Sequence, residues 1–157
     1  MNSLRLRRLV VASLFGAISF ILIFFNFSVP VISYFAEFDF SAIPELIGGF
    51  VLGPVGAVEI ITIKVLLKLA VEPSPVTLIG VIQNFILSVC YVLPAVFYYR
   101  KHKTKKGAAI SMLLGSILSI VMAIVTNLYL VFPVYMKIFE MDWEGIIQMC
   151  STVSPWI

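Results

Sequence analysis

Three long stretches of this chain contain no charged residue, and they constrain its fold more than any other feature. They cover residues 9–36, 73–99 and 107–136. An α-helix needs about 20 apolar residues to cross the hydrocarbon core of a bilayer, so each stretch is long enough to span a membrane. The chain is 61% hydrophobic and 12% charged, whereas soluble domains average about 45–50% and about 25%. We therefore predict an all-α integral membrane protein, and not a soluble enzyme, a disulfide scaffold or a disordered chain.

The basic residues predict how these spans are oriented. Eight of the eleven Lys and Arg residues lie in two clusters, Arg5/Arg7/Arg8 and Arg100/Lys101/Lys103/Lys105/Lys106. Such clusters at the ends of apolar spans are typical of cytoplasmic loops, so they indicate membrane topology and not nucleic-acid binding. The first apolar run is longer than a usual signal peptide core and lacks a clear cleavage site, which favours a retained helix. We predict a multi-pass protein of the cell membrane with a cytoplasmic N-terminus.

Residues 42–71 are apolar but interrupted by Gly48, Gly49 and the sequence Gly53-Pro54-Val55-Gly56. The two basic clusters can share one side of the membrane only if an even number of spans separates them. We therefore predict two short helices here, joined by a cytoplasmic turn at Gly53-Pro54-Val55-Gly56, because Gly and Pro favour turns. The expected helices cover residues 9–27, 43–52, 57–71, 77–99 and 107–132 of a single domain, residues 1–157. Five spans leave the C-terminus outside. The sequence ends at Pro155-Trp156-Ile157 with no basic residue, as though a sixth helix were missing.

The sequence contains no recognisable pattern for enzymatic chemistry. It lacks a nucleophile elbow, a dinucleotide-binding glycine pattern, a phosphate-binding loop and a zinc-protease motif. The one histidine, His102, lies inside a basic cluster, and Cys90 and Cys150 match no metal-ligand spacing. We therefore expect no catalytic residue, no metal site and no cofactor in this chain. If it takes part in ATP-driven transport, a partner must hydrolyse the ATP.

Charged residues in the second short helix are the first candidates for a binding site. Glu59, Lys64 and Lys68 lie in a segment that should cross the bilayer, where charge is costly unless it is paired or hydrated. Glu59 and Lys68 are near the two ends, so their side chains can reach the lipid headgroups. Lys64 is the most central and is expected to face a ligand pocket or a neighbouring helix.

Polar and aromatic side chains collect in the half of the bundle that should face outward. Asp39, Phe40 and Ser41 follow the first span, where Asp39 or Ser41 would cap the next helix or contact a ligand. The outer halves of the last two spans carry Gln83, Asn84, Asn127 and Tyr129. Amide groups are expected to face the bundle interior, where they bond between helices or line a pocket. The convergence of these groups favours a substrate pocket.

Small residues mark the inner half of the first span. Ala12/Gly16 and Ser13/Ala17 are spaced four apart, and such pairs allow another helix to approach closely. Packing within the bundle and docking of a partner protein both explain this pattern.

Together these residues resemble the S components, the substrate-binding membrane subunits, of energy-coupling factor (ECF) vitamin transporters, in particular the riboflavin-transporter branch. The resemblance rests on Asp39-Phe40-Ser41-x-x-Pro44, the Gly53-Pro54 turn, Lys64, and Asn127-x-Tyr129-x-x-x-Pro133-x-Tyr135. It implies a six-helix bundle with a vitamin pocket near the outer face, covered by the loop after helix one. It also implies that small residues on helix one dock on a transmembrane coupling subunit that two ABC-type ATPases drive.

The resemblance implies a non-catalytic vitamin-binding subunit, with riboflavin as the first ligand and pyridoxine or hydroxymethylpyrimidine as the next. The expected ligand contacts are Asp39, Phe40, Ser41, Lys64, Gln83, Asn84, Asn127 and Tyr129, and the expected partner contacts are Ala12, Ser13, Gly16 and Ala17. An S component for pantothenate and a self-sufficient homo-oligomeric transporter are the alternatives. A membrane-embedded enzyme has no catalytic group to support it.

Overall fold

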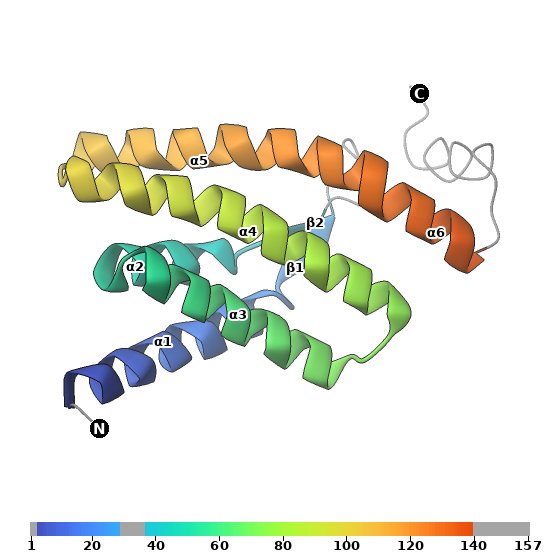
Figure 1. Cartoon of the computed structure of the whole chain (residues 1–157), viewed down its shortest axis with the longest axis horizontal. Helices are drawn as coiled ribbons and strands as arrows, with labels where there is room; N and C mark the ends of the chain where they lie inside the picture. The colour runs from blue at the N-terminus through green and yellow to red at the C-terminus, as the bar shows by residue number, and fades with distance from the viewer. Residues whose placement is uncertain (1–2, 29–36, 140–157) are drawn as a thin grey trace.

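The computed structural model describes residues 3–28 and 37–139, which form a helical bundle and one short two-stranded ribbon (Figure 1). The ribbon pairs β1 with β2 in antiparallel register, with Phe27 opposite Phe38. The elements in chain order are α1 Ser3–Leu22, β1 Asn26–Ser28, β2 Glu37–Asp39, α2 Ala42–Leu52, α3 Pro54–Val71, α4 Pro75–Lys101, α5 Lys105–Thr126, the π-helical turn η1 Asn127–Val131, and α6 Phe132–Phe139.

The five expected helices are present, but the first and the last differ in extent. The helix expected at 9–27 is α1, which ends at Leu22 because Phe24 and Phe25 bond three residues back, to Ile21 and Leu22. The chain then extends into β1, an element that the apolar run does not predict. The helix expected at 107–132 continues through η1 into α6 and reaches Phe139. Residues 140–157 lie outside the described part of the chain, so the expectation about a sixth helix is not addressed.

Local sequence explains where the helices begin and end. The predicted break between α2 and α3 is present but shorter than expected, because Pro54, Val55 and Gly56 already belong to α3. Gly53 alone separates the two helices with a φ of 85°, which favours glycine, and Pro54 occupies the first turn of α3. Ser74 and Thr104 cap α4 and α5, because their hydroxyl oxygens accept the N–H of Thr77 at 3.0 Å and of Gly107 at 2.9 Å.

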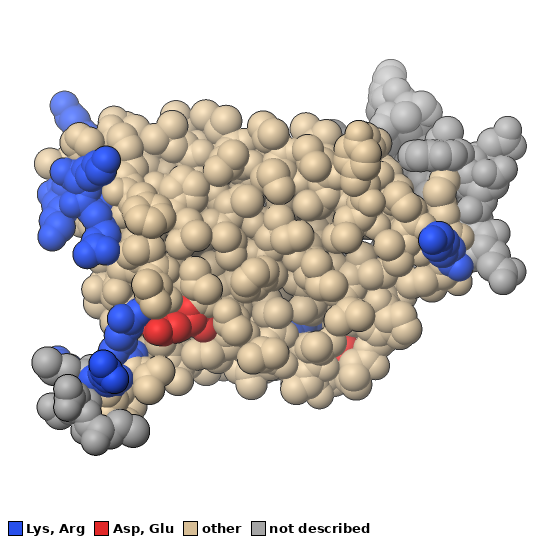
Figure 2. All heavy atoms as spheres, in the orientation of Figure 1, with Lys and Arg blue, Asp and Glu red and all other residues tan. Residues whose placement is uncertain are grey.

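Both basic clusters lie at one end of the molecule. Figure 2 shows Lys and Arg gathered there, over the start of α1 and the α4–α5 junction that Figure 1 places at the same end. The α2–α3 turn belongs to this end too, because Gly53 lies against the Arg100 guanidinium. The predicted arrangement of four helices between the two clusters is therefore present. Within the described residues, α4 and the continuous helix from Lys105 to Ile138 are long and apolar enough to span a membrane.

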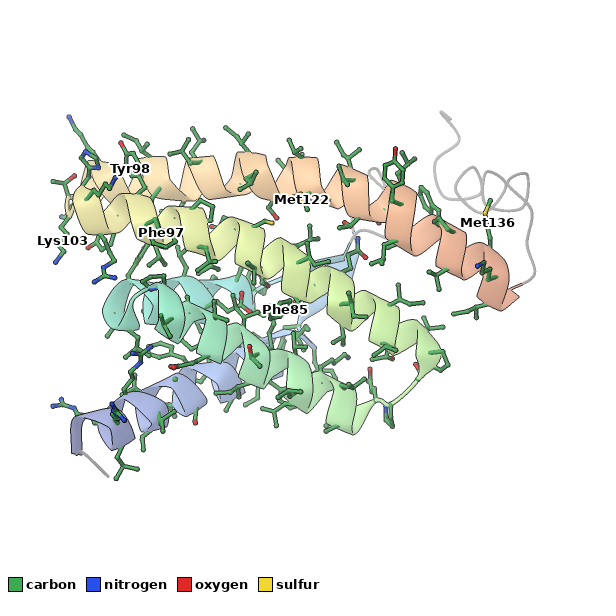
Figure 3. The ribbon with its side chains drawn as sticks, in the orientation of Figure 1. Phe85, Phe97, Tyr98, Lys103, Met122 and Met136 are labelled. Carbon is green, nitrogen blue, oxygen red and sulfur yellow. The ribbon has the colours of Figure 1, made fainter. Side chains whose placement is uncertain are left out.

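The core lies where α2, α3 and α4 meet, and it is formed by Leu46, Ala57, Ile61, Val92, Ala95 and Val96. The short helix α2 approaches this core closely because it carries glycine on the inner face. A Cβ on Gly49 would lie 2.7 Å from Val96 Cγ2. Phe85 of α4 packs against the same cluster (Figure 3).

Candidate functional site

Lys64 of α3 lies at the centre of a buried polar network. Its side chain is fully buried and forms an ion pair with Glu45 of α2, which is also fully buried. Lys64 Nζ also donates to Ser41 Oγ and to Ser88 Oγ, each at 3.1 Å. An ammonium group has three donors, and three partners within the protein engage them. Lys64 was expected to face either a ligand pocket or a neighbouring helix. In the structure its side chain faces the neighbouring helices.

The network also reaches α1, through Ser19. Ser19 Oγ lies 2.6 Å from the carbonyl oxygen of Ser41 and 3.2 Å from Glu45 Oε1. Four helices are thereby joined around one ion pair. The sequence does not predict Ser19, Glu45 or Ser88 as members of a network around Lys64. The presence of one carboxylate, Glu45, and one central ammonium group, Lys64, in two consecutive short apolar helices could have predicted this ion pair.

Ser41 does not cap α2 with its side chain, although it stands at the N-cap position. The hydroxyl accepts from Lys64 instead, and the residue is almost completely buried. Phe40, the preceding residue, has 45% of its surface exposed. Asp39 is the last residue of β2 and pairs with Asn26 in the ribbon. Within the connection from the ribbon to α2, Ser41 is therefore held by Lys64 in the bundle interior, whereas Phe40 is partly exposed.

Two of the predicted amide residues meet between α4 and η1. Gln83 Nε2 donates to Asn127 Oδ1 at 2.8 Å. This bond leaves the Nδ2 group of Asn127 as a donor and Oε1 of Gln83 as an acceptor. Asn84, next along α4, accepts from Ser88 at 3.5 Å and so lies beside the Lys64 network. The structure thus brings Gln83 and Asn127 together, as the sequence predicts.

Tyr129 lies apart from this amide pair. It is 76% exposed, and it follows Asn127 by two positions, which places the two side chains on different faces of the helix. Asn127 begins the π-helical turn, and such turns occur frequently at functional sites. The structure therefore does not bring Tyr129 together with Asn127, and its role as a ligand contact stays a prediction.

The small residues of α1 divide into two groups. Ala12 and Gly16 are buried, and a Cβ on Gly16 would lie 2.7 Å from Ile63 Cγ2 of α3. Ser13 is exposed and Ala17 is half-buried. The pair Ala12/Gly16 therefore faces α3, and Ser13/Ala17 lies farther round the helix.

An apolar groove runs along α1 and α3, with a volume of about 360 Å³. It is lined by Leu9, Ala12, Val55, Val58, Glu59, Thr62 and Ile63. Arg8 and Glu59 form an ion pair at 3.3 Å beside it. Glu59 was expected to reach the headgroups, but here it bonds to α1, because the close α1–α3 packing brings Arg8 within range. Lys68 pairs with Glu72 at 2.7 Å and lies over the ring of Phe24.

The long apolar helices, the buried Lys64–Glu45 ion pair and the Gln83–Asn127 amide pair define a class, the all-α membrane protein with polar groups inside its helical bundle. A sequence model described as "ECF transporter, substrate-specific component" matches residues 7–157. The chain belongs to this family.

Relatives and a solved structure agree with this assignment. The chain is 30% identical to "Riboflavin transporter FmnP" of Bacillus subtilis (strain 168) over 133 residues, which is 84% of this chain and 70% of that protein. It is 28% identical to "Riboflavin transporter RibU" of Staphylococcus aureus (strain TCH60), over 90% of this chain and 74% of the relative. The structure described as "Structure and mechanism of the S component of a bacterial ECF transporter" superposes with a TM-score of 0.75 at 26% identity, covering 83% of this chain and 77% of that one.

Proposed function

We propose that this chain is the riboflavin-binding subunit of an ATP-driven vitamin importer. The names of its relatives support riboflavin, and the Gln83–Asn127 pair is the observation that carries the chemistry. The proposed ligand contacts are Gln83 and Asn127, with Asn84, Asp39 and Phe40 around them. Lys64 and Ser41 hold the connection to α2 in place.

The amide pair fits one edge of a flavin ring. The pyrimidine part of that ring carries an N–H group flanked by carbonyl groups. Oε1 of Gln83 accepts from such an N–H, and Nδ2 of Asn127 donates to the adjacent carbonyl. A few fixed polar groups beside apolar walls are typical of sites for such ligands. Pantothenate lacks a ring with this edge and is therefore the weaker alternative.

Riboflavin binding tests this proposal directly. Riboflavin fluorescence, titrated with the purified chain in detergent, should be quenched at a 1:1 ratio. Replacing Asn127 by Ala removes one hydrogen bond and leaves Gln83 without its partner, so the affinity should fall about 10-fold or more. Thr77→Ala, on the same helix as Gln83 but in its first turn, is the matched control. Tight binding of pantothenate and none of riboflavin would refute the ligand assignment.

Coupling to ATP hydrolysis is the second part of the proposal. We infer that a transmembrane coupling subunit docks along the α1–α3 groove and on Ser13 and Ala17, with two ABC-type ATPases on the cytoplasmic side. The basic end, which carries the N-terminus of α1, then faces the cytoplasm. Reconstitution in vesicles, with and without the coupling module, separates this proposal from a self-sufficient transporter. Uptake by this chain alone, without ATP, would exclude the importer.

A further inference from the structure

A pocket at the basic end of the bundle lies outside the proposed vitamin site. Its volume is about 150 Å³, and its walls include Phe50 and Gly53 from the α2 end and Tyr99, Arg100 and Lys103 from the α4 end. The rings of Phe50 and Tyr99 contact each other with centroids 4.3 Å apart. Gly53 leaves room for Arg100, because a Cβ there would lie 3.2 Å from Arg100 Nη1. Two cations, an aromatic pair and a helix end thus surround one cavity.

The cations of this pocket have no carboxylate partner in the described part of the chain. The three ion pairs found among residues 3–28 and 37–139 are Arg8–Glu59, Lys64–Glu45 and Lys68–Glu72. None of them includes a residue of the α4–α5 segment. Lys103 projects from the end of the molecule (Figure 3). Part of this charge complements the negative ends of α2 and α4, but two adjacent cations exceed what these partial charges balance.

The length of α4 places this pocket at the depth of the lipid headgroups. The helix has 27 residues and therefore rises about 40 Å, which matches a bilayer including its polar layers, about 40–45 Å. Val51, which lines the pocket near the end of α2, is 68% exposed. Apolar surface next to a cationic pocket is what a lipid with acyl chains and an anionic headgroup would cover.

We propose that this pocket binds one anionic glycerophospholipid of the phosphatidylglycerol type. The lipid phosphate pairs with Arg100 and Lys103, as basic pockets between membrane helices do with anionic headgroups. The headgroup hydroxyls donate to the carbonyl groups at the end of α2, which a helix leaves without intrahelical donors. The acyl chains lie along Val51 on the lipid-facing side of the pocket. A choline headgroup has no hydroxyl donor, and its positively charged ammonium group would be repelled by Arg100 and Lys103. Phosphatidylcholine therefore fits the pocket less well.

Native mass spectrometry of the detergent-purified chain tests this site, with dioleoyl-phosphatidylglycerol and dioleoyl-phosphatidylcholine as probes. The wild-type chain should retain one phosphatidylglycerol in preference to phosphatidylcholine. The variant Arg100→Gln/Lys103→Gln should bind it about 25-fold more weakly, about fivefold for each cation. The matched control is Lys105→Gln/Lys106→Gln, which removes the same charge from the same segment outside the pocket walls.

Three outcomes would overturn the proposal. Equal loss in both variants would mean that the basic end attracts anions only through its total charge. Equal retention of the two lipids would exclude recognition of the headgroup. Displacement of the lipid by millimolar inorganic phosphate would identify a site for a free anion. Riboflavin binding should be equal in all three proteins, because Gln83 lies about 25 Å along α4 from Arg100, so a failure here is distinct from a failure of the vitamin assignment.

Discussion

Replacing Lys64 by Met should destabilise the bundle more than almost any other single substitution. Lys64 and Glu45 are both fully buried, and removal of one partner leaves the other charge unpaired at membrane depth. Breaking a buried ion pair in this way costs about 3–5 kcal/mol. For a chain of this size each kcal/mol lowers the melting temperature by about 2–4 °C. Lys64→Met, and equally Glu45→Leu, should therefore lower it by about 6 to 20 °C.

The double variant Lys64→Met/Glu45→Leu should recover most of this loss. Apolar residues of similar volume often replace a buried pair without net cost, and the remaining deficit comes from hydroxyl groups that lose a partner, about 1 kcal/mol each. Ser19 still donates to the Ser41 carbonyl, and Ser88 still lies 3.5 Å from Asn84. We expect the double variant to lie within about 2 kcal/mol of the wild type.

Thermal unfolding in detergent, followed by circular dichroism, measures both effects. Lys68→Met is the matched control: it breaks the Lys68–Glu72 pair one turn along the same helix, where Glu72 is 47% exposed, and an exposed pair contributes less than about 1 kcal/mol. If the losses of the two single variants add in the double variant, Lys64 and Glu45 do not stabilise each other and the network described here is wrong. A control loss as large as that of Lys64→Met would likewise refute the argument from burial.

Two further predictions follow from close packing. Gly49→Ala should lower the stability by about 1–3 kcal/mol because the new methyl group meets Val96 at 2.7 Å. Gly80→Ala, with open space around it, should raise the stability by about 0.5–1 kcal/mol. Thermal unfolding of the two variants checks these opposite signs, and equal signs would contradict the close packing of α2. Ser13→Trp, on the exposed side of α1, should leave folding and riboflavin binding intact while preventing assembly with the coupling subunit. Gly16→Trp should instead unfold the chain through its clash with α3. Co-purification with the coupling module and a melting curve separate the two effects, and normal assembly of Ser13→Trp would exclude that side of α1 as a docking surface.

Topology was predictable from the sequence because charge placement restricts it strongly. The two basic clusters and the Gly53-Pro54 turn give an even number of helices between the clusters, and the structure has this arrangement. The ends of α1 and α5 were less predictable, because an apolar run does not indicate where a membrane helix stops. Phe24 and Phe25 are as apolar as the helix before them, yet the chain turns there and extends into β1.

Pairing between side chains was only partly predictable. Gln83 and Asn127 were expected to face the interior, because amides are costly in lipid, and they meet there. Tyr129 was placed with them on the basis of its proximity in sequence, but a helix sends residues two apart to different faces. Lys64 was correctly singled out as central. Its partner Glu45 was overlooked, because contacts between two helices depend on how the helices rotate about their axes, and a single sequence does not contain that information.

The difference between the two polar groups at membrane depth explains why one of them is the better candidate for ligand binding. Lys64 has a protein partner for each of its three donors, so a ligand would have to break an existing bond to reach it. Gln83 and Asn127 share one bond within the described part of the chain, and each amide retains a donor or an acceptor. Gln83 and Asn127 are half-buried, and polar groups shielded from water cost free energy unless they are paired, so their remaining donor and acceptor favour the proposal that another molecule completes the pairing. The degree of pairing, more than the residue type, therefore favours Gln83 and Asn127 over Lys64 as the proposed ligand contacts.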